Sequence, residues 1–154
     1  MDIFNIFSTK KNKYFSKEEE ERMVQAIRFA EKQTSGEIRL FVESHCKYID
    51  PVERAIELFT ELKMYNTKDR NGVLIYIAIK DRQLAIFGDE GIHKRLGQAF
   101  WLDEVNTIIG EFLQQHFTDG IIKIINDIGQ ALKTHFPYER EDKNELDDDI
   151  VFGK

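Results

Sequence analysis

Acidic and amide side chains stand at the outer ends of two neighbouring apolar runs. The runs cover residues 73–79 and 84–87 and are joined by a short polar stretch. Oxygen-bearing side chains of this kind either bond the backbone in turns or gather around a hard cation. The second chemistry requires that they lie together, which depends on the directions of the strands. The side chains are those of Asp69, Asn71, Asp89 and Glu90.

Three strands are predicted around these side chains. Residues 73–79 are continuously apolar and rich in β-branched types, which predicts a strand buried on both faces. Residues 84–87 predict the returning strand of a hairpin, after a polar turn at 80–83. An earlier segment, 37–45, begins with apolar and polar residues in alternation and predicts a third strand. Because a helix capped by Asp50 is predicted between 37–45 and 73–79, those two strands should run parallel, with a right-handed crossover.

Helical periodicity occupies most of the remaining chain. A capping box of Ser16 and Glu19 opens a first helix over residues 17–34. The later helices are expected near 92–98, near 101–116, and from a cap at Thr118 or Asp119 to a stop at Pro137. Helices that alternate with strands predict an α/β protein, here a three-layer α/β/α sandwich with a small central mixed sheet and helices on both faces.

Strand direction brings the oxygen-bearing side chains to one end of the predicted sheet. The first strand begins at Glu37, and the parallel second strand begins just after Asp69 and Asn71. The third strand returns antiparallel, so Asp89 and Glu90 come back to the same end. Several carboxylates at one point repel each other unless a cation joins them. An all-oxygen ligand set suits Ca²⁺ or Mg²⁺ better than zinc, so the sequence predicts a divalent metal site formed by these five residues.

The alternative is that these residues only shape turns. Asp and Asn side chains bond nearby backbone, and Asn71-Gly72 is a common turn dipeptide. A complete calcium loop is missing, because Ala78 stands six residues after Gly72, where the loop pattern requires an acid. Residue types alone leave both interpretations open.

Length, charge and cysteine content narrow the classes of function. The 154 residues suit one domain, expected over 16–136, with an N-terminal segment 1–15 and an acidic, mobile tail 137–154. A net charge of −6 without a large basic patch argues against nucleic-acid binding. The single cysteine, Cys46, excludes an intrachain disulfide. No stretch approaches the roughly 18 apolar residues of a membrane span, so we expect a cytoplasmic protein without a transmembrane segment.

Five short elements along the chain form a recognisable set. A T/S-G-E element at 34–37 opens the first strand, and a D-x-N-G element at 69–72 leads into the apolar second strand. A D-R pair at 81–82 opens the return strand, and a glycine-containing turn at 88–91 ends it. An F-x-x-G element at 117–120 precedes the last helix. The set resembles the TPM domain family, which includes a thylakoid-lumen acid-phosphatase-like protein and many bacterial proteins.

The resemblance implies an α/β/α sandwich and a divalent-ion site, often for calcium, at one end of the sheet. By motif position it carries this role to Glu37, Asp69, Asn71 and Asp89, with Glu90 beside them. It also implies a disputed acid phosphatase activity. The chain departs from the family pattern where Asp89-Glu90 replaces the usual aromatic residue of the glycine-rich turn.

Two functions follow from this site. The first is a metal-stabilised interaction module that recognises a protein partner. The second is a metal-dependent phosphomonoesterase, in which a bound cation polarises a phosphate. Hydrolysis also needs positive groups around the phosphate oxygens, and Arg70, His93 and Arg95 are near in sequence, although they could equally be solvated. No catalytic residue is assigned.

Overall fold

Four strands form one mixed sheet in the order β3-β2-β1-β4 within the part of the chain that the structure describes. The structure is a computed structural model and describes residues 14–113, 117–138 and 150–153. The predicted N-terminal segment and acidic tail lie mostly outside these residues. The elements are α2 (Lys17–Glu31), β1 (Glu37–Glu43), α3 (Pro51–Glu61), β2 (Gly72–Ala78), β3 (Gln83–Gly88), α4 (Glu90–Leu96), α5 (Gln98–Leu113), α6 (Phe117–His135) and β4 (Ile150–Phe152).

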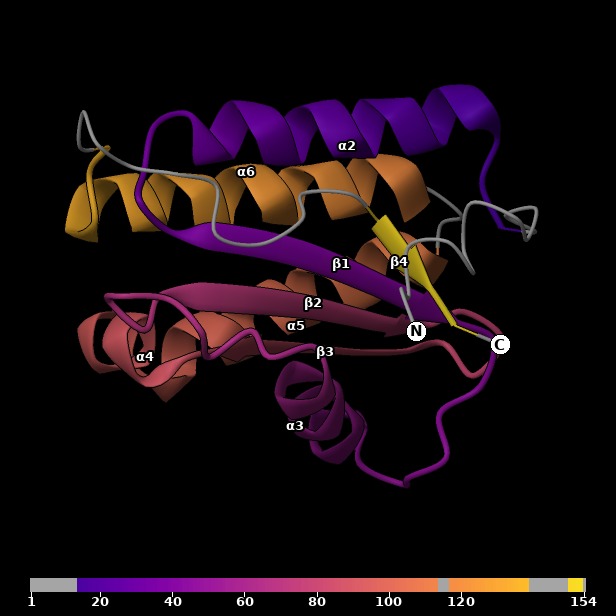
Figure 1. The fold of residues 1–154 in the computed structure, drawn as a ribbon. Helices are drawn as coiled ribbons and strands as arrows, with labels where there is room; N and C mark the ends of the chain where they lie inside the picture. The colour runs from indigo at the N-terminus through magenta and orange to yellow at the C-terminus, as the bar shows by residue number, and fades with distance from the viewer. Residues whose placement is uncertain (1–13, 114–116, 139–149, 154) are drawn as a thin grey trace.

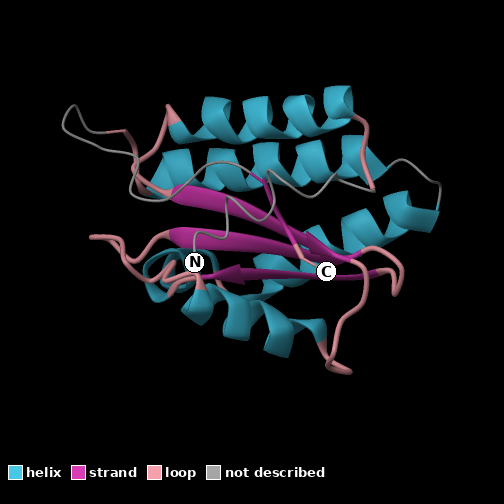
Figure 2. Cartoon of the chain, turned by 45° about the vertical axis from the view of Figure 1, so that its right-hand side comes forward, coloured by secondary structure: helices cyan, strands magenta, loops and turns pink. Residues whose placement is uncertain are grey.

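The helices lie on both faces of this sheet, which confirms the predicted α/β sandwich. α2 and α6 run side by side over one face, and α5 packs against α6 and β3 on the same side (Figure 1). α3 covers the opposite face, where it contacts β2 and β3 (Figure 2). The strands therefore have apolar residues on both sides, as in β2, where every residue is buried.

The strand directions also agree with the prediction. β1 pairs parallel with β2, and Glu37 is opposite Gly72. β2 pairs antiparallel with β3, and Val73 is opposite Gly88. The start of β1, the start of β2 and the end of β3 consequently lie at the same end of the sheet.

β4 was not predicted as a strand. Its three residues pair parallel with β1, with Leu40 opposite Ile150. Val151 is 1% exposed, so this short segment fills a real position in the core. By taking the outer side of β1, β4 leaves β3 as the other edge of the sheet.

Local capping explains where the first helices begin. Ser16 and Glu19 form the predicted capping box at the start of α2. The side chain of Asp50 accepts a hydrogen bond from the Val52 N–H at the start of α3, where Pro51 stands in the first turn. α6 begins at Phe117, before both residues that were expected to cap it. No helix among the described residues has the length and hydropathy needed to cross a membrane.

Candidate functional site

Three of the five predicted ligands are buried together at one end of the sheet. Glu37 is 2% exposed, Asn71 1% and Asp89 3%. The backbone joins them, since the Glu37 N–H donates to Asn71 O at 3.4 Å and the Asp89 N–H donates to Gly72 O at 2.9 Å. Burial of carboxylates and an amide at one place is costly unless each is bonded, so their partners decide what the site can do.

Asn71 is held from two sides and keeps one atom without a partner. Its N–H donates to Thr67 Oγ1 at 3.2 Å, and its Nδ2 donates to Ser35 Oγ at 3.2 Å. Among the described residues, nothing donates to the buried Asn71 Oδ1. A buried oxygen acceptor without a donor is unfavourable by about 1–3 kcal/mol, and a cation or an ordered water would remove that cost.

Asp89 has two roles that the sequence did not indicate. It is the N-cap of α4, where its Oδ1 accepts a hydrogen bond from the Glu90 N–H at 2.8 Å. Its carboxylate is also bound by Arg70, through Nε to Oδ2 at 2.7 Å and through Nη2 to Oδ1 at 2.9 Å. This bidentate pair raises the pKa of the Arg70 guanidinium. Both oxygens of the buried Asp89 are therefore already balanced by an arginine.

The other two predicted ligands lie at the surface. Asp69 is exposed in the turn before β2. The Glu90 side chain is 66% exposed, and its Oε1 lies 3.3 Å from Arg70 Nη1. The turn and the start of α4 are nevertheless in close contact, because the Gly91 N–H donates to Arg70 O at 2.8 Å. The five residues thus share one end of the sheet, but their side chains divide into a buried group of three and an exposed group of two.

The residue types at this end fit a hard cation. Arg70, however, already occupies the Asp89 carboxylate and would compete with a cation for it. Asn71 Oδ1 offers an unused oxygen, and carboxylates supply the remaining ligand type that Ca²⁺ and Mg²⁺ prefer. In the described part of the chain, no three His, Cys, Asp or Glu side chains are grouped closely enough to hold a metal ion. Metal binding by Glu37, Asp69, Asn71, Asp89 and Glu90 therefore stays a prediction.

Three residues at this end have roles that the sequence analysis missed, although Arg70 was considered there for phosphate binding. Arg70 has a positive φ of 50°, which turns its side chain back toward Asp89, and no sequence period predicts such a conformation. Ser35 and Thr67 position Asn71 through their hydroxyl groups. A signal was present for two of them, because Ser35 belongs to the T/S-G-E element and Arg70 lies inside the D-x-N-G element.

A second polar network occupies the opposite end of the sheet. Glu43 accepts from Arg54 Nε at 2.9 Å and Nη2 at 3.2 Å, and from the Tyr76 hydroxyl at 2.5 Å. Burial and the bond to Glu43 raise the pKa of Tyr76 above its usual range. Nearby, Asp81 Oδ1 lies 2.8 Å from His45 Nδ1, and its pKa is lowered mainly by that contact. These groups are hydrogen-bonded to one another where β1 and β2 end.

Comparison with known proteins places the chain in a family. The family model for the TPM domain matches residues 8–131. The chain belongs to the TPM domain family. It is similar to the BA42 protein of the psychrophilic bacterium Bizionia argentinensis, whose NMR structure has 42% sequence identity and a TM-score of 0.84 over 94% of this chain and 99% of that chain.

A more distant structure shares the fold alone. The N-terminal domain of the cg2496 protein from Corynebacterium glutamicum has 14% sequence identity and a TM-score of 0.60, over 77% of this chain and 74% of that chain. No curated protein matches the chain. The comparisons thus establish a TPM domain.

The basic residues considered for phosphate binding have other partners in this TPM domain. Arg70 binds Asp89, as described. The His93 ring accepts a hydrogen bond at Nδ1 from Trp101 Nε1, at 3.0 Å. The guanidinium of Arg95 lies 5.8 Å from the centre of the Phe136 ring. Each side chain is therefore engaged within the fold.

Proposed function

We propose that this TPM domain binds Ca²⁺ or Mg²⁺ where β1 and β2 begin, and that the ion stabilises the domain as a protein-interaction module. The observation that carries the proposal is the buried Asn71 Oδ1, which lacks a hydrogen-bond donor among the described residues. Its neighbours at the same sheet end include the buried carboxylates of Glu37 and Asp89. An oxygen atom held without a donor at an acidic end of the sheet suits a hard cation.

Arg70 sets the condition for binding in this proposal. Asp89 cannot give both oxygens to an ion and to a guanidinium at once, so the cation must displace at least part of the Arg70 contact. The Arg70 side chain is 42% exposed and can turn into solvent. Asp69 and Glu90 are exposed beside it and can complete the ligand set from the surface. A bound cation would neutralise the carboxylates there.

An interaction module is favoured over a phosphomonoesterase. A phosphate site needs cationic side chains directed at the substrate oxygens. Arg70 and Arg95 are instead directed at a carboxylate and an aromatic ring of the same domain. Hydrolysis of a generic phosphate ester by the purified protein with Ca²⁺ or Mg²⁺, lost in both Asp69→Asn and Asp89→Asn with folding intact, would restore the enzyme hypothesis.

Thermal unfolding in a cation titration tests the proposed site. Ligand that binds only the folded state stabilises it by RT ln(1 + [L]/Kd), or about 2.7 kcal/mol at a hundredfold excess over Kd. Wild-type protein should gain melting temperature with Ca²⁺ or Mg²⁺, and Glu37→Gln should gain much less. The matched control is Asp81→Asn, which changes a carboxylate at the opposite end of the sheet. A melting temperature that stays constant up to millimolar cation would refute the site.

A further inference from the structure

The outer edge of β3 carries backbone groups that no strand of the described residues uses. The Ile79 N–H, one residue beyond β2, donates to Glu43 O at 2.9 Å, so odd-numbered β2 residues direct their backbone groups toward β1. Even-numbered residues face β3, as the bond from the Asp89 N–H to Gly72 O at 2.9 Å confirms. In this register Ala85 bonds to β2.

Three residues of β3 alternate with those that bond to β2, and their backbone groups point away from β2. Since backbone groups alternate along a strand, Leu84, Ile86 and Gly88 direct their N–H and C=O groups away from β2. In the part of the chain that the structure describes, no strand lies on that side of β3. The edge therefore offers three alternate positions for pairing with an extended chain.

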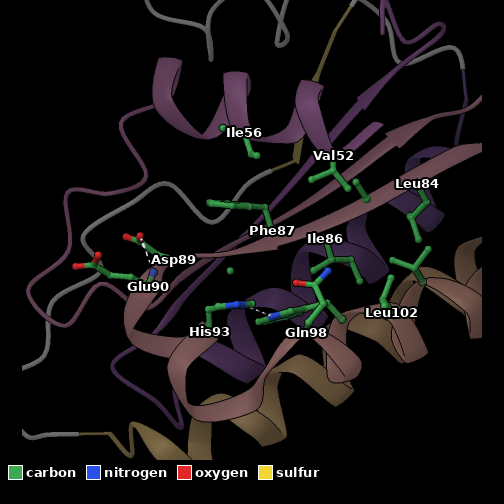
Figure 3. A pocket seen from close by; sticks show the side chains of 14 residues that line it. Val52, Ile56, Leu84, Ile86, Phe87, Asp89, Glu90, His93, Gln98 and Leu102 are labelled. Atoms are coloured by element: carbon green, nitrogen blue, oxygen red, sulfur yellow. Dashed lines mark hydrogen bonds between the residues drawn. The ribbon is translucent and has the colours of Figure 1, made fainter. Parts of the chain in front are cut away.

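This edge forms the floor of an apolar groove. A cavity of about 560 Å³ runs along β3 and is lined by consecutive residues from Leu84 to Glu90. Consecutive strand residues point to opposite faces, so they line one cavity together only where it follows the strand edge. α3 contributes Val52 and Ile56 to one wall, and α5 contributes Leu102 to the other (Figure 3).

The walls expose apolar side chains that ordinary packing would cover. Val52 is 41% exposed, Ile56 44% and Leu102 52%. They come from helices on opposite faces of the sheet, so an added strand would meet apolar surface on both of its own faces. At the end of the groove, the carboxylates of Asp89 and Glu90 share the guanidinium of Arg70, so these three side chains together leave a negative rim.

We infer that the β3 edge and this groove bind an extended segment of a partner protein, which is apolar on both faces and carries a basic residue beside Glu90. The unpaired backbone positions select an extended chain, because a helix has no free backbone groups to offer them. The two apolar walls select a continuously apolar run, and the acidic rim selects a cation. The inference rests on the proposed role as an interaction module, and it does not require the bound cation.

Hydrogen exchange measured on the full chain with a synthetic peptide tests the pairing. β3 spans roughly 20 Å, so the probe is a capped peptide of about eight residues, Lys-Val-Ile-Val-Thr-Val-Ile-Lys. Peptide should slow amide exchange at Leu84, Ile86 and Gly88 by about tenfold or more, because these amides gain acceptors. Ala85 and Phe87 already donate to β2 and should change much less. Exchange that stays unchanged at Leu84, Ile86 and Gly88 overturns the inference.

Two N-methylated peptides separate strand pairing from simple apolar contact. One carries methyl groups on alternate amides, and the other carries them on the remaining amides. In strand addition, one alternate set of peptide amides bonds to β3 and the other set faces solvent. Only the peptide that is methylated on the first set should therefore fail to bind. Equal binding by both peptides overturns pairing. Binding is followed by the fluorescence of Trp101, the single tryptophan, which lines the groove.

Substitutions at the exposed wall residues test where the peptide binds, and they leave the buried core unchanged. Leu102→Ser and Ile56→Ser should each weaken peptide binding about tenfold. The matched control is Ile109→Ser, since Ile109 is a similarly exposed residue of α5, at 41%, outside the lining of the groove. Glu90→Gln should weaken the lysine-flanked peptide and lower the salt dependence of its binding. Equal effects of all the apolar substitutions would contradict this location.

Two further outcomes would assign the edge to another occupant. If amide exchange at Leu84, Ile86 and Gly88 is already slow in the free monomer, the chain covers its own edge. Protection that appears with protein concentration, together with dimer formation in sedimentation, would mean that a second copy binds there. The peptide titrations are repeated with EDTA and with Ca²⁺ or Mg²⁺. If the wild-type melting temperature does not respond to either cation while peptide binding is intact, only the cation proposal is refuted.

Discussion

Arg70 binds both carboxylate oxygens of Asp89, at 2.7 and 2.9 Å, although the two residues are 19 positions apart in the chain. The pair joins the turn before β2 to the first residues of α4. Asp89 is 3% exposed and needs a positive partner, whereas Arg70 is partly solvated and can be replaced. In the proposed cation site, the Asp89 carboxylate would bind either the Arg70 guanidinium or a divalent ion from solution.

Substitution of Arg70 should improve the response to divalent cations. Arg70→Gln removes the guanidinium and leaves the Asp89 carboxylate buried without its charge partner, so the cation-free protein should melt at a lower temperature. Cation affinity should rise about two- to fivefold, because an ion no longer displaces an ion pair. Calorimetric titration with Ca²⁺ and Mg²⁺ measures the affinity.

The control for this variant is Arg82→Gln. Arg82 also has a positive φ, at 52°, but it lies in the β2–β3 turn at the opposite end of the sheet. Its substitution should leave cation affinity unchanged. Weaker cation binding in Arg70→Gln than in wild type would mean that the arginine supports the site and does not compete with it.

Gly91 should tolerate no side chain, because α4 fits directly against the turn before β2. A Cβ atom at Gly91 would lie 2.0 Å from Asp69 O and 2.7 Å from Arg70 O, both backbone atoms. Gly91→Ala must push the helix away from the turn, which should lower the free energy of unfolding by about 1–3 kcal/mol. Urea denaturation followed by circular dichroism measures it.

Gly110 provides the matched comparison. It is also a helical glycine, but nothing lies within 4 Å of a Cβ atom built there. Gly110→Ala should stabilise the protein by about 0.5–1 kcal/mol through helix propensity alone. If Gly91→Ala behaves like Gly110→Ala, the close contact between α4 and the turn is wrong.

The arrangement of these elements could largely be predicted from the sequence. The continuously apolar run of β2 indicated a buried strand, and the helix between β1 and β2 fixed their parallel direction. Those directions were enough to bring Glu37, Asn71 and Asp89 to one end of the sheet. The backbone positions of these three residues could therefore be predicted from the strand directions alone.

Contacts that depend on long-range pairing could not be predicted in the same way. β4 has three residues, which is too short for a periodic signal, yet its place beside β1 decides that β3 is an edge. The bond between Arg70 and Asp89 depends on a positive φ that no residue pattern encodes. For this reason the sequence indicated uncompensated acids, while in the structure Arg70 pairs with two of them, Asp89 and Glu90.

The Glu43–Arg54 pair should contribute much more to stability than a surface ion pair. The side chains are 8% and 14% exposed, and Glu43 also accepts from the Tyr76 hydroxyl. Arg54→Met leaves a buried carboxylate without its cation and should lower the free energy of unfolding by about 3 kcal/mol. Chemical denaturation at neutral pH measures the change.

The comparison is Lys47→Met in the neighbouring surface pair. Lys47 Nζ lies 2.6 Å from Glu57 Oε1, but its side chain is 55% exposed. Solvent screens such a pair, so this substitution should have a small effect. A similar loss in Arg54→Met and Lys47→Met would show that burial does not strengthen the Glu43–Arg54 pair.

Glu104 on α5 should make the protein less stable as pH rises through the weakly acidic range. Burial, followed by the nearby Asp127 carboxylate of α6, raises the pKa of Glu104 to about 7. In the unfolded chain its pKa returns to the ordinary value near 4.5. Between these two pH values the folded state retains a proton that the unfolded state has lost, so the free energy of unfolding falls as pH rises and then levels off above about 7.

Glu104→Gln should remove this pH dependence, since glutamine stays neutral while keeping the size of the side chain. The variant should be more stable than wild type at pH 8 by about 1–3 kcal/mol and nearly equal to it at pH 4. Glu61→Gln, at an exposed glutamate at the end of α3, serves as the control and should follow the wild-type curve. Urea denaturation across this pH range measures all three proteins. If Glu104→Gln keeps the wild-type pH profile, ionisation of Glu104 does not oppose the packing of α5 on α6.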